Sequence, residues 1–114
     1  MAGYLTTHVL DTAQGRPAAG LSITLYRIEG GARAEIAHAV TDADGRTDAP
    51  ILPEGRFATG DYELVFAAGA YLAAAGLPDR FLGDVPVRFR MAEDGHYHVP
   101  LLLSPFGYST YRGS

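Results

Sequence analysis

The sequence predicts an all-β fold, a two-sheet sandwich of seven or eight short strands with one short helix. Two observations carry this prediction. Apolar and polar residues alternate with a period of two in several runs, and clusters of Gly, Pro and Asp separate these runs at even spacing. With 114 residues, the chain is expected to form a single domain over residues 1–114.

The first two runs are amphipathic strands. In Tyr4–Asp11, His8 and Leu10 share one face, and the pattern leaves open whether His8 points to the core or to the surface. Residues 14–17, which read Gln-Gly-Arg-Pro, break this run. The second strand has the clearest alternation in the chain, with apolar positions at Leu21, Ile23 and Leu25.

The middle of the chain alternates between strands and loops. A third strand is expected at Glu35–Thr41, and Asp42–Gly45 follows as a turn in which the glycine supplies a positive φ. The run Pro50–Gly60 is rich in Pro and Gly and predicts a loop, with one short strand near Arg56–Phe57. Asp61–Ala67 predicts the next strand.

The remaining elements lead to the C-terminal segment. An Ala-rich helix of about two turns is expected at Ala70–Leu77, followed by a strand at Val85–Met91 and a turn at 93–95. The final long strand begins at His96. Its two faces carry different residues: Tyr97, Val99, Leu101 and Leu103 on one, and His96, His98, Pro100 and Leu102 on the other. One row can fill a core, while the other carries two imidazoles.

The last residues, Tyr111–Ser114, have an unusual composition for a frayed end, because such ends are normally small and polar. We therefore expect this tail to belong to an interface or to a site. The alternative is a final edge strand with a tyrosine packed over the end of the sandwich. Arg112 alternates away from Tyr111 and is expected to form a supporting ion pair.

The composition excludes several classes of function. There is no Cys, so neither a disulfide framework nor a thiolate nucleophile is available. All basic residues are Arg, so Schiff-base chemistry is excluded, and the scattered net charge of -4 argues against a nucleic-acid partner. No segment reads as a signal peptide or reaches membrane-spanning length, so we expect no membrane association and a cytoplasmic location.

Three segments of the chain carry a resemblance to a known family. They read LTTHVLDTAQGRPA from Leu5, TDADGR from Thr41 and HYHVPLLLSPFGYSTYRGS from His96. Together they resemble the transthyretin-like 5-hydroxyisourate hydrolases of urate breakdown, and the match runs from Leu5 to Ser114. The terminal Tyr-Arg-Gly-Ser is the most specific segment, because it separates the hydrolases from the thyroid-hormone carriers of the same fold.

This resemblance implies a fold, an assembly and a reaction. The fold is the transthyretin (prealbumin)-like β-sandwich, and the assembly is a homotetramer with active sites in a channel at the dimer-dimer interface. The reaction is the hydrolysis of the small molecule 5-hydroxyisourate to 2-oxo-4-hydroxy-4-carboxy-5-ureidoimidazoline in purine catabolism. No cofactor and no metal are expected.

The resemblance also implies which residues form the site. The catalytic residues are His8, Arg46, His98 and Ser114, and the substrate-binding residues are His8, Arg46 and Tyr111. Opening a cyclic amide needs a base for water, a donor for the developing oxyanion and a flat clamp on the heterocycle, which imidazole and guanidinium supply. Water activation is assigned to the His8/His98 pair and carbonyl polarisation to Arg46. The sequence does not decide which histidine is the base.

Two other functions stay open at this point. His96 and His98 share one strand face, and with His8 as a third ligand they would resemble a His₃ zinc site with an open position. The chain also resembles, more loosely, the prealbumin-like binding or structural modules. Those modules need neither His98 nor the Tyr-Arg-Gly-Ser tail, so the intact tail favours the enzyme.

Overall fold

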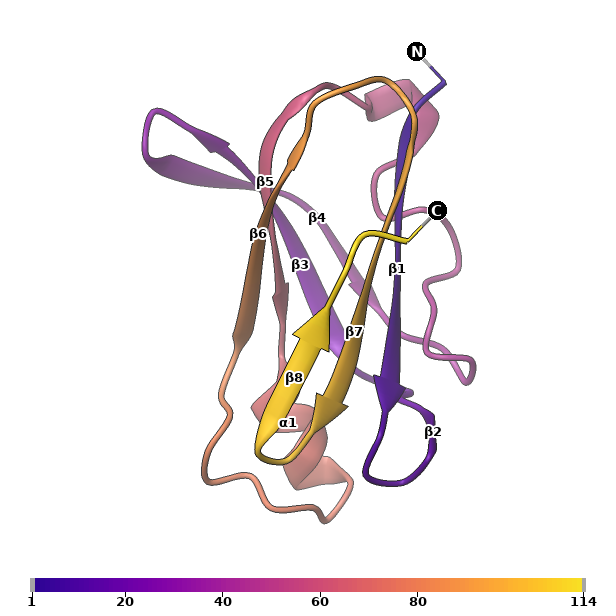
Figure 1. Cartoon of the computed structure of the whole chain (residues 1–114), viewed down its shortest axis with the longest axis vertical. Helices are drawn as coiled ribbons and strands as arrows, with labels where there is room; N and C mark the ends of the chain where they lie inside the picture. Colours follow the sequence, from indigo (N-terminus) through magenta and orange to yellow (C-terminus); the bar gives the residue numbers. More distant parts are fainter. Residues whose placement is uncertain (1, 114) are drawn as a thin grey trace.

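Two four-stranded sheets lie face to face in the computed structural model, which describes residues 2–113 (Figure 1). Within these residues the strands are β1 (Tyr4–Asp11), β2 (Arg16–Pro17), β3 (Ser22–Glu29), β4 (Ala32–Val40), β5 (Gly60–Phe66), β6 (Val85–Met91), β7 (His96–Ser104) and β8 (Gly107–Thr110). One sheet has the order β2-β1-β7-β8 and the other the order β4-β3-β5-β6. β1 and β7 run parallel, whereas the other strand pairs are antiparallel. The predicted sandwich is confirmed.

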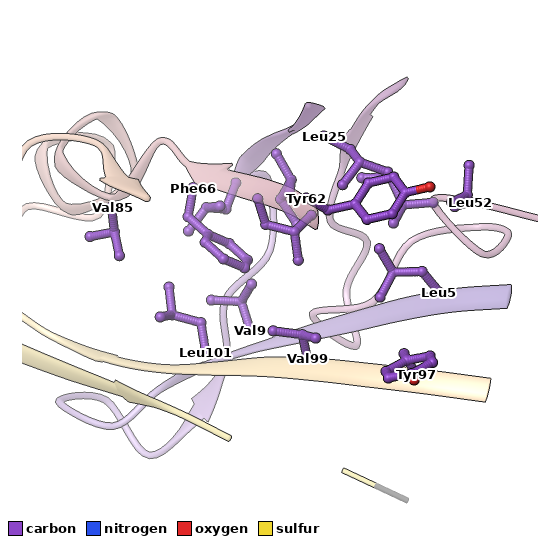
Figure 2. Close-up of a cluster of buried hydrophobic side chains, with 14 of the residues drawn as sticks. Leu5, Val9, Leu25, Leu52, Tyr62, Phe66, Val85, Tyr97, Val99 and Leu101 are labelled. Carbon is purple, nitrogen blue, oxygen red and sulfur yellow. The ribbon is translucent and has the colours of Figure 1, made fainter. Parts of the chain in front are cut away.

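The core fills the space between the two sheets (Figure 2). Leu5 and Val9 of β1 face Tyr62 and Phe66 of β5 across this interior, and none of the four is more than 1% exposed. Each side chain comes from the inward row of its strand, as the period of two requires. The Tyr62 hydroxyl donates to the Ala58 carbonyl at 2.7 Å, so its polar end is satisfied at the edge of the core.

β7 and β1 turn their histidines outward. The buried row of β7 is the one predicted from the sequence, namely Tyr97, Val99, Leu101 and Leu103. Because successive side chains in a strand point to opposite faces, His96 and His98 lie on the outer face of the sheet. In β1 the inward neighbours of His8 are buried while His8 is half-buried, so this side chain points outward too.

The segment between β4 and β5 differs from its prediction. The short strand expected near Arg56–Phe57 is wrong, because Glu54–Arg56 form one turn of 3₁₀ helix, η1. The Arg56 N–H donates to the Pro53 carbonyl at 3.0 Å, a bond to the third residue back that an extended chain does not make. β4 also begins earlier than predicted, directly after the Gly pair that precedes it, and ends at Val40.

Helix α1 (Ala68–Ala74) lies at the end of the sandwich opposite the first residues of β1 (Figure 1). It begins and ends earlier than the predicted range 70–77. Gly69 lies inside the first turn, where its N–H donates to the Gly83 carbonyl at 3.0 Å. Gly76 ends the helix with a φ of 71°, which a glycine adopts without strain. Within residues 2–113, no helix has the length and apolar character that crossing a membrane requires.

Candidate functional site

The outer faces of β1 and β7 form one continuous row of polar side chains. The parallel register places Tyr4 opposite His96 and Thr6 opposite His98. The Tyr4 and His96 rings stack with their centroids 4.2 Å apart and their planes 9° apart. The backbone pairing of two strands that are far apart in sequence therefore brings both C-terminal imidazoles beside the N-terminal strand.

The Thr6 hydroxyl joins the two imidazoles of β7. Its Oγ1 lies 2.8 Å from His96 Nε2 and 2.8 Å from His98 Nδ1. The centroids of the two rings are 6.2 Å apart and their planes are tilted by 54°, so the rings do not stack on each other. This hydroxyl is their shared hydrogen-bond partner.

His8 is held by a backbone carbonyl of the neighbouring turn. Its Nε2 lies 2.8 Å from the Asp44 carbonyl oxygen. A carbonyl oxygen only accepts, so Nε2 must carry the proton and donate it. In the neutral ring the free lone pair is therefore on Nδ1, and this is the nitrogen of His8 that can accept a proton or a hydrogen bond from a ligand.

The turn that carries Arg46 is docked on β1. His8 and Arg46 pair as an isolated antiparallel β-bridge, and the Val9 N–H donates to the Gly45 carbonyl at 2.8 Å. Gly45 has a φ of 74°, and a methyl group at this position would collide with the Val9 carbonyl oxygen. The Asp42 carboxylate accepts the Arg46 N–H at 3.2 Å, which closes the turn. Glycine is thus needed here for conformation and for close approach.

Burial and positive charge act together on His98. The pKa of this imidazole lies below its ordinary value, first because burial disfavours the charged ring. The charge of Arg46 and then those of His96 and His8 lower it further. His98 is consequently neutral at pH 7, the form in which an imidazole accepts a proton.

The C-terminal tail returns to β7. The Gly113 N–H donates to the His98 carbonyl at 2.7 Å, and a methyl group on Gly113 would lie 2.8 Å from His98 Cδ2. Arg112 does not form the expected ion pair within residues 2–113. Its guanidinium lies 4.3 Å from the centroid of the Tyr97 ring, as a cation-π contact. The described tail residues Arg112 and Gly113 therefore both contact β7.

The structure brings together three of the predicted site residues. His8, Arg46 and His98 lie on the outer side of the same sheet, where Arg46 and His8 act on the charge state of His98. Tyr111 is 59% exposed and lines a groove with residues of β6, away from this row. Ser114 lies outside the described residues.

Sequence reasoning overlooked two neighbours of His98. Thr6 lies two positions before His8 on the same strand face, so pairing of β1 with β7 would have placed it beside one of the histidines. The alternation of β1 therefore contained this information, but the sequence does not show which strand pairs with β1. Gly113 was recognised only as part of a motif, and its close approach to the His98 ring needs coordinates.

Metal ligation by the histidines does not fit their positions. Across residues 2–113, no three His, Cys, Asp or Glu side chains converge in an arrangement that could hold a metal ion. The zinc site considered from the sequence is therefore not formed by these residues.

The chain is similar to known proteins along nearly its whole length. The model of the HIUase/Transthyretin family matches residues 5–113. A 5-hydroxyisourate hydrolase of Mesorhizobium japonicum is 64% identical, over 98% of this chain and 93% of that protein. The structure of Klebsiella pneumoniae 5-hydroxyisourate hydrolase superposes with a TM-score of 0.84 at 38% identity, covering 98% of this chain and 99% of that one. A crystal structure of (S)-allantoin synthase gives a TM-score of 0.90 at 43% identity, and it covers 98% of this chain but only 44% of that longer chain.

Proposed function

Because this chain belongs to the HIUase/Transthyretin family, we propose that it is a hydrolase that opens the ring of 5-hydroxyisourate. The predicted transthyretin (prealbumin)-like sandwich is confirmed by the same membership. The observation that carries the proposal is the grouping of His8, Arg46 and His98 on one sheet face, with His98 neutral at pH 7. A binding module would need none of these groups in this arrangement.

The reaction is a hydrolysis of a cyclic amide, and His98 is the base that we propose. A neutral His98 accepts a proton from water while the water oxygen bonds to the carbonyl carbon, and the carbonyl oxygen becomes an oxyanion. The carbon–nitrogen bond then breaks, the nitrogen takes a proton, and a carboxylate and a ureido group remain. The lowered pKa of His98 supports this role, because it keeps the ring unprotonated.

The other residues bind and polarise the substrate. Arg46 presents a planar guanidinium that can hold the developing oxyanion and orient the heterocycle. His8 accepts a hydrogen bond from a ring N–H through Nδ1, because Nε2 is already bonded to the Asp44 carbonyl. Tyr111 as a substrate-binding residue and Ser114 as a catalytic residue are also part of the proposal, and their support is the resemblance of the terminal Tyr-Arg-Gly-Ser.

The assembly we propose is a homotetramer with sites at the dimer-dimer interface. β6 and β8 are both edge strands, and the groove beside them is lined by the exposed Tyr111. Unpaired edges of this kind are ready to pair with a second copy. Light scattering of the purified protein tests this, and a stable monomer with full specific activity would contradict it.

The biological setting is also a proposal. We place the single hydrolase domain, residues 1–114, in urate breakdown within purine metabolism, and we propose that it acts in the cytoplasm. Fractionation of cells that express the protein tests the compartment. Recovery of the protein outside the cytoplasmic fraction would overturn the proposed cytoplasmic location.

The activity is tested by a coupled assay in which urate oxidase generates the unstable substrate. The purified wild type should accelerate the decay of 5-hydroxyisourate, and His98→Asn or His8→Asn should lower the rate by about two to four orders of magnitude. His38→Asn is the matched control, since His38 is exposed on β4 in the other sheet and should leave the rate unchanged. A wild type that does not accelerate the decay removes the proposal.

A further inference from the structure

The Thr6 hydroxyl lies between two imidazoles and has a single proton to share. Its oxygen is 2.8 Å from His96 Nε2 and 2.8 Å from His98 Nδ1. When both rings are neutral, the hydroxyl donates its proton to one ring nitrogen and accepts a proton from the other. We propose that Thr6 is a positioning residue that couples the protonation of His98 to that of His96, and so decides whether His98 Nε2 acts as a base or as an acid. This coupling rests on the hydrolytic function proposed above.

Two neutral arrangements satisfy both contacts. In the first, His98 Nδ1–H donates to Thr6 Oγ1 and the Thr6 hydroxyl donates to His96 Nε2. His98 Nε2 then carries a lone pair and can take a proton from water. In the second, the Thr6 hydroxyl donates to His98 Nδ1 and His96 Nε2–H donates to Thr6 Oγ1. His98 Nε2 then carries a proton that it can give away.

Proton transfers along the hydrogen-bonded groups connect the two arrangements. Once His98 Nε2 has taken a proton from water, the ring is an imidazolium. Its Nδ1 proton passes to the Thr6 oxygen while the Thr6 hydroxyl proton passes to His96 Nε2, so the positive charge moves from His98 to His96. His96 releases one proton from Nδ1 to solvent. His98 is then neutral, and the proton taken from water is still on Nε2.

The same groups reset after the carbon–nitrogen bond breaks. His98 Nε2–H gives its proton to the leaving amide nitrogen, and the Thr6 proton moves back to His98 Nδ1. His96 Nε2–H returns its proton to the Thr6 oxygen, and His96 Nδ1 regains one proton from solvent. One proton is released and one is taken up in each cycle, so the charges balance. Within residues 2–113, His96 Nδ1 and His98 Nε2 have no hydrogen-bond partner and are the nitrogens left to exchange protons.

The surrounding structure holds these groups in register. The parallel pairing of β1 and β7 places Thr6 opposite His98 and Tyr4 opposite His96. The Tyr4 ring stacks on the His96 ring at 4.2 Å and restricts its rotation. Thr is branched at Cβ and stiff at χ1, so its hydroxyl has few positions. Burial lowers the pKa of His98 and favours the neutral ring that both arrangements require.

The experiment separates the effect of the Thr6 hydroxyl from the effect of the shape of its side chain. Thr6→Val removes the hydroxyl at nearly constant volume, and Thr6→Ser keeps it. Thr7→Val is the matched control, because Thr7 is the next residue of the same strand but faces inward, where its hydroxyl donates to the Val99 carbonyl at 2.8 Å. Nitrogen-15 NMR of the full chain reports which nitrogen of His96 and His98 carries the proton. The coupled assay gives kcat and KM.

We expect the wild type to adopt the first arrangement, with both rings protonated on Nδ1. Thr6→Val should turn His98 into a mixture of tautomers and lower kcat about 10- to 100-fold at nearly constant KM, the range found when the partner that orients a metal-bound histidine is removed. Thr6→Ser and Thr7→Val should keep the wild-type tautomers and most of kcat.

Three outcomes overturn the proposal or separate it from the proposed function. Wild-type spectra in which both rings, or neither, carry the proton on the nitrogen that faces Thr6 overturn it without any variant, even where Thr6→Val does not fold. A folded Thr6→Val protein with wild-type tautomers and kcat overturns it as well. A wild type that shows linked tautomers, lost in Thr6→Val, but no hydrolysis refutes the hydrolase function and supports the coupling.

Discussion

Gly113 lies against His98 so closely that no side chain fits between them. The Gly113 N–H donates to the His98 carbonyl at 2.7 Å, and a methyl group on Gly113 would lie 2.8 Å from His98 Cδ2. Gly113→Ala should therefore push the imidazole from its position. A displacement of about 1 Å in a reacting group can lower a rate about 100-fold, and we expect a loss of that order in kcat/KM in the coupled assay.

A second glycine variant controls for the loss of backbone freedom. A methyl group on Gly83 meets nothing within 4 Å, and like Gly113 this residue has no positive φ. Gly83→Ala should keep the wild-type kcat/KM. If Gly113→Ala keeps it too, with an unchanged NMR signal from His98, the tail does not constrain the ring.

The turn at Gly45 gives a prediction for stability and activity together. Gly45 combines a φ of 74° with close approach to the Val9 carbonyl, so Gly45→Ala strains the backbone and pushes the turn off β1. We expect a loss of about 1 to 3 kcal/mol in the free energy of unfolding, measured by urea denaturation. Since Arg46 follows directly, kcat/KM should fall as well.

Gly20→Ala separates the effect of backbone strain from the effect of displacing the turn that carries Arg46. Gly20 has a similar φ of 78°, but a methyl group there meets nothing within 4 Å. It should lose a smaller amount of stability and no activity. Equal losses in the two variants would show that close packing of the turn on β1 does not position Arg46.

The inward-facing and outward-facing side chains of β7 could be predicted, because they depend only on the local alternation of residues along the strand. Burying Tyr97 and Val99 necessarily turns His96 and His98 outward, whatever the rest of the fold does. The outward orientation of His8 could not be predicted, because both faces of its strand carry plausible core residues. Burial against the opposite sheet decides that orientation, and it is a tertiary effect.

Contacts between segments that are far apart in the chain could not be predicted from the sequence. Thr6 meets His98 because β1 pairs in parallel with a strand near the other end of the chain, and no turn signal specifies that pairing. The predicted start of the helix, directly after Gly69, was wrong for a related reason. The Gly69 N–H bonds to the Gly83 carbonyl, and this contact keeps Gly69 inside α1. The roles assigned to Tyr111 and Ser114 stay predictions.

The lowered pKa of His98 gives a pH prediction for activity. Burial first, then the charges of Arg46, His96 and His8, lower this pKa below 6.5. If neutral His98 is the base, kcat/KM should fall as pH decreases, with the midpoint of this fall below 6.5. NMR titration of His98 should give the same midpoint. A midpoint at or above 6.5 contradicts the assignment.

The same shift predicts how stability changes with pH. Between the folded pKa of His98 and 6.5, the unfolded chain binds more protons at this residue than the folded protein does. The contribution of His98 to the free energy of unfolding therefore rises with pH across this window and is constant above it. His98→Asn should remove this part of the slope when urea unfolding is measured at several pH values. An identical slope in wild type and variant would contradict the prediction.

Removing Tyr111–Ser114 tests whether the tail serves the site or the fold. A chain that ends at Thr110 loses the hydrogen bond from Gly113 to His98 and the contact of Arg112 with Tyr97. The core contains none of the described tail residues, so the sheet signal in circular dichroism should be retained. Hydrolysis should be nearly abolished, because preorganised groups around a reacting centre contribute several kcal/mol to the transition state, about 3 kcal/mol for one donor.

A single substitution separates the stabilising contact of the tail from its effect on the site. Arg112→Gln removes only the guanidinium that lies 4.3 Å from the Tyr97 ring centroid, an exposed contact of a kind that contributes about 0.5 to 1 kcal/mol. It should lower the free energy of unfolding by that amount and keep kcat/KM. Suppose instead that the truncated chain turns over normally, or that Arg112→Gln is as inactive as the truncation. In the first case the tail is outside the site, and in the second its function depends on the guanidinium rather than on the contact between Gly113 and His98.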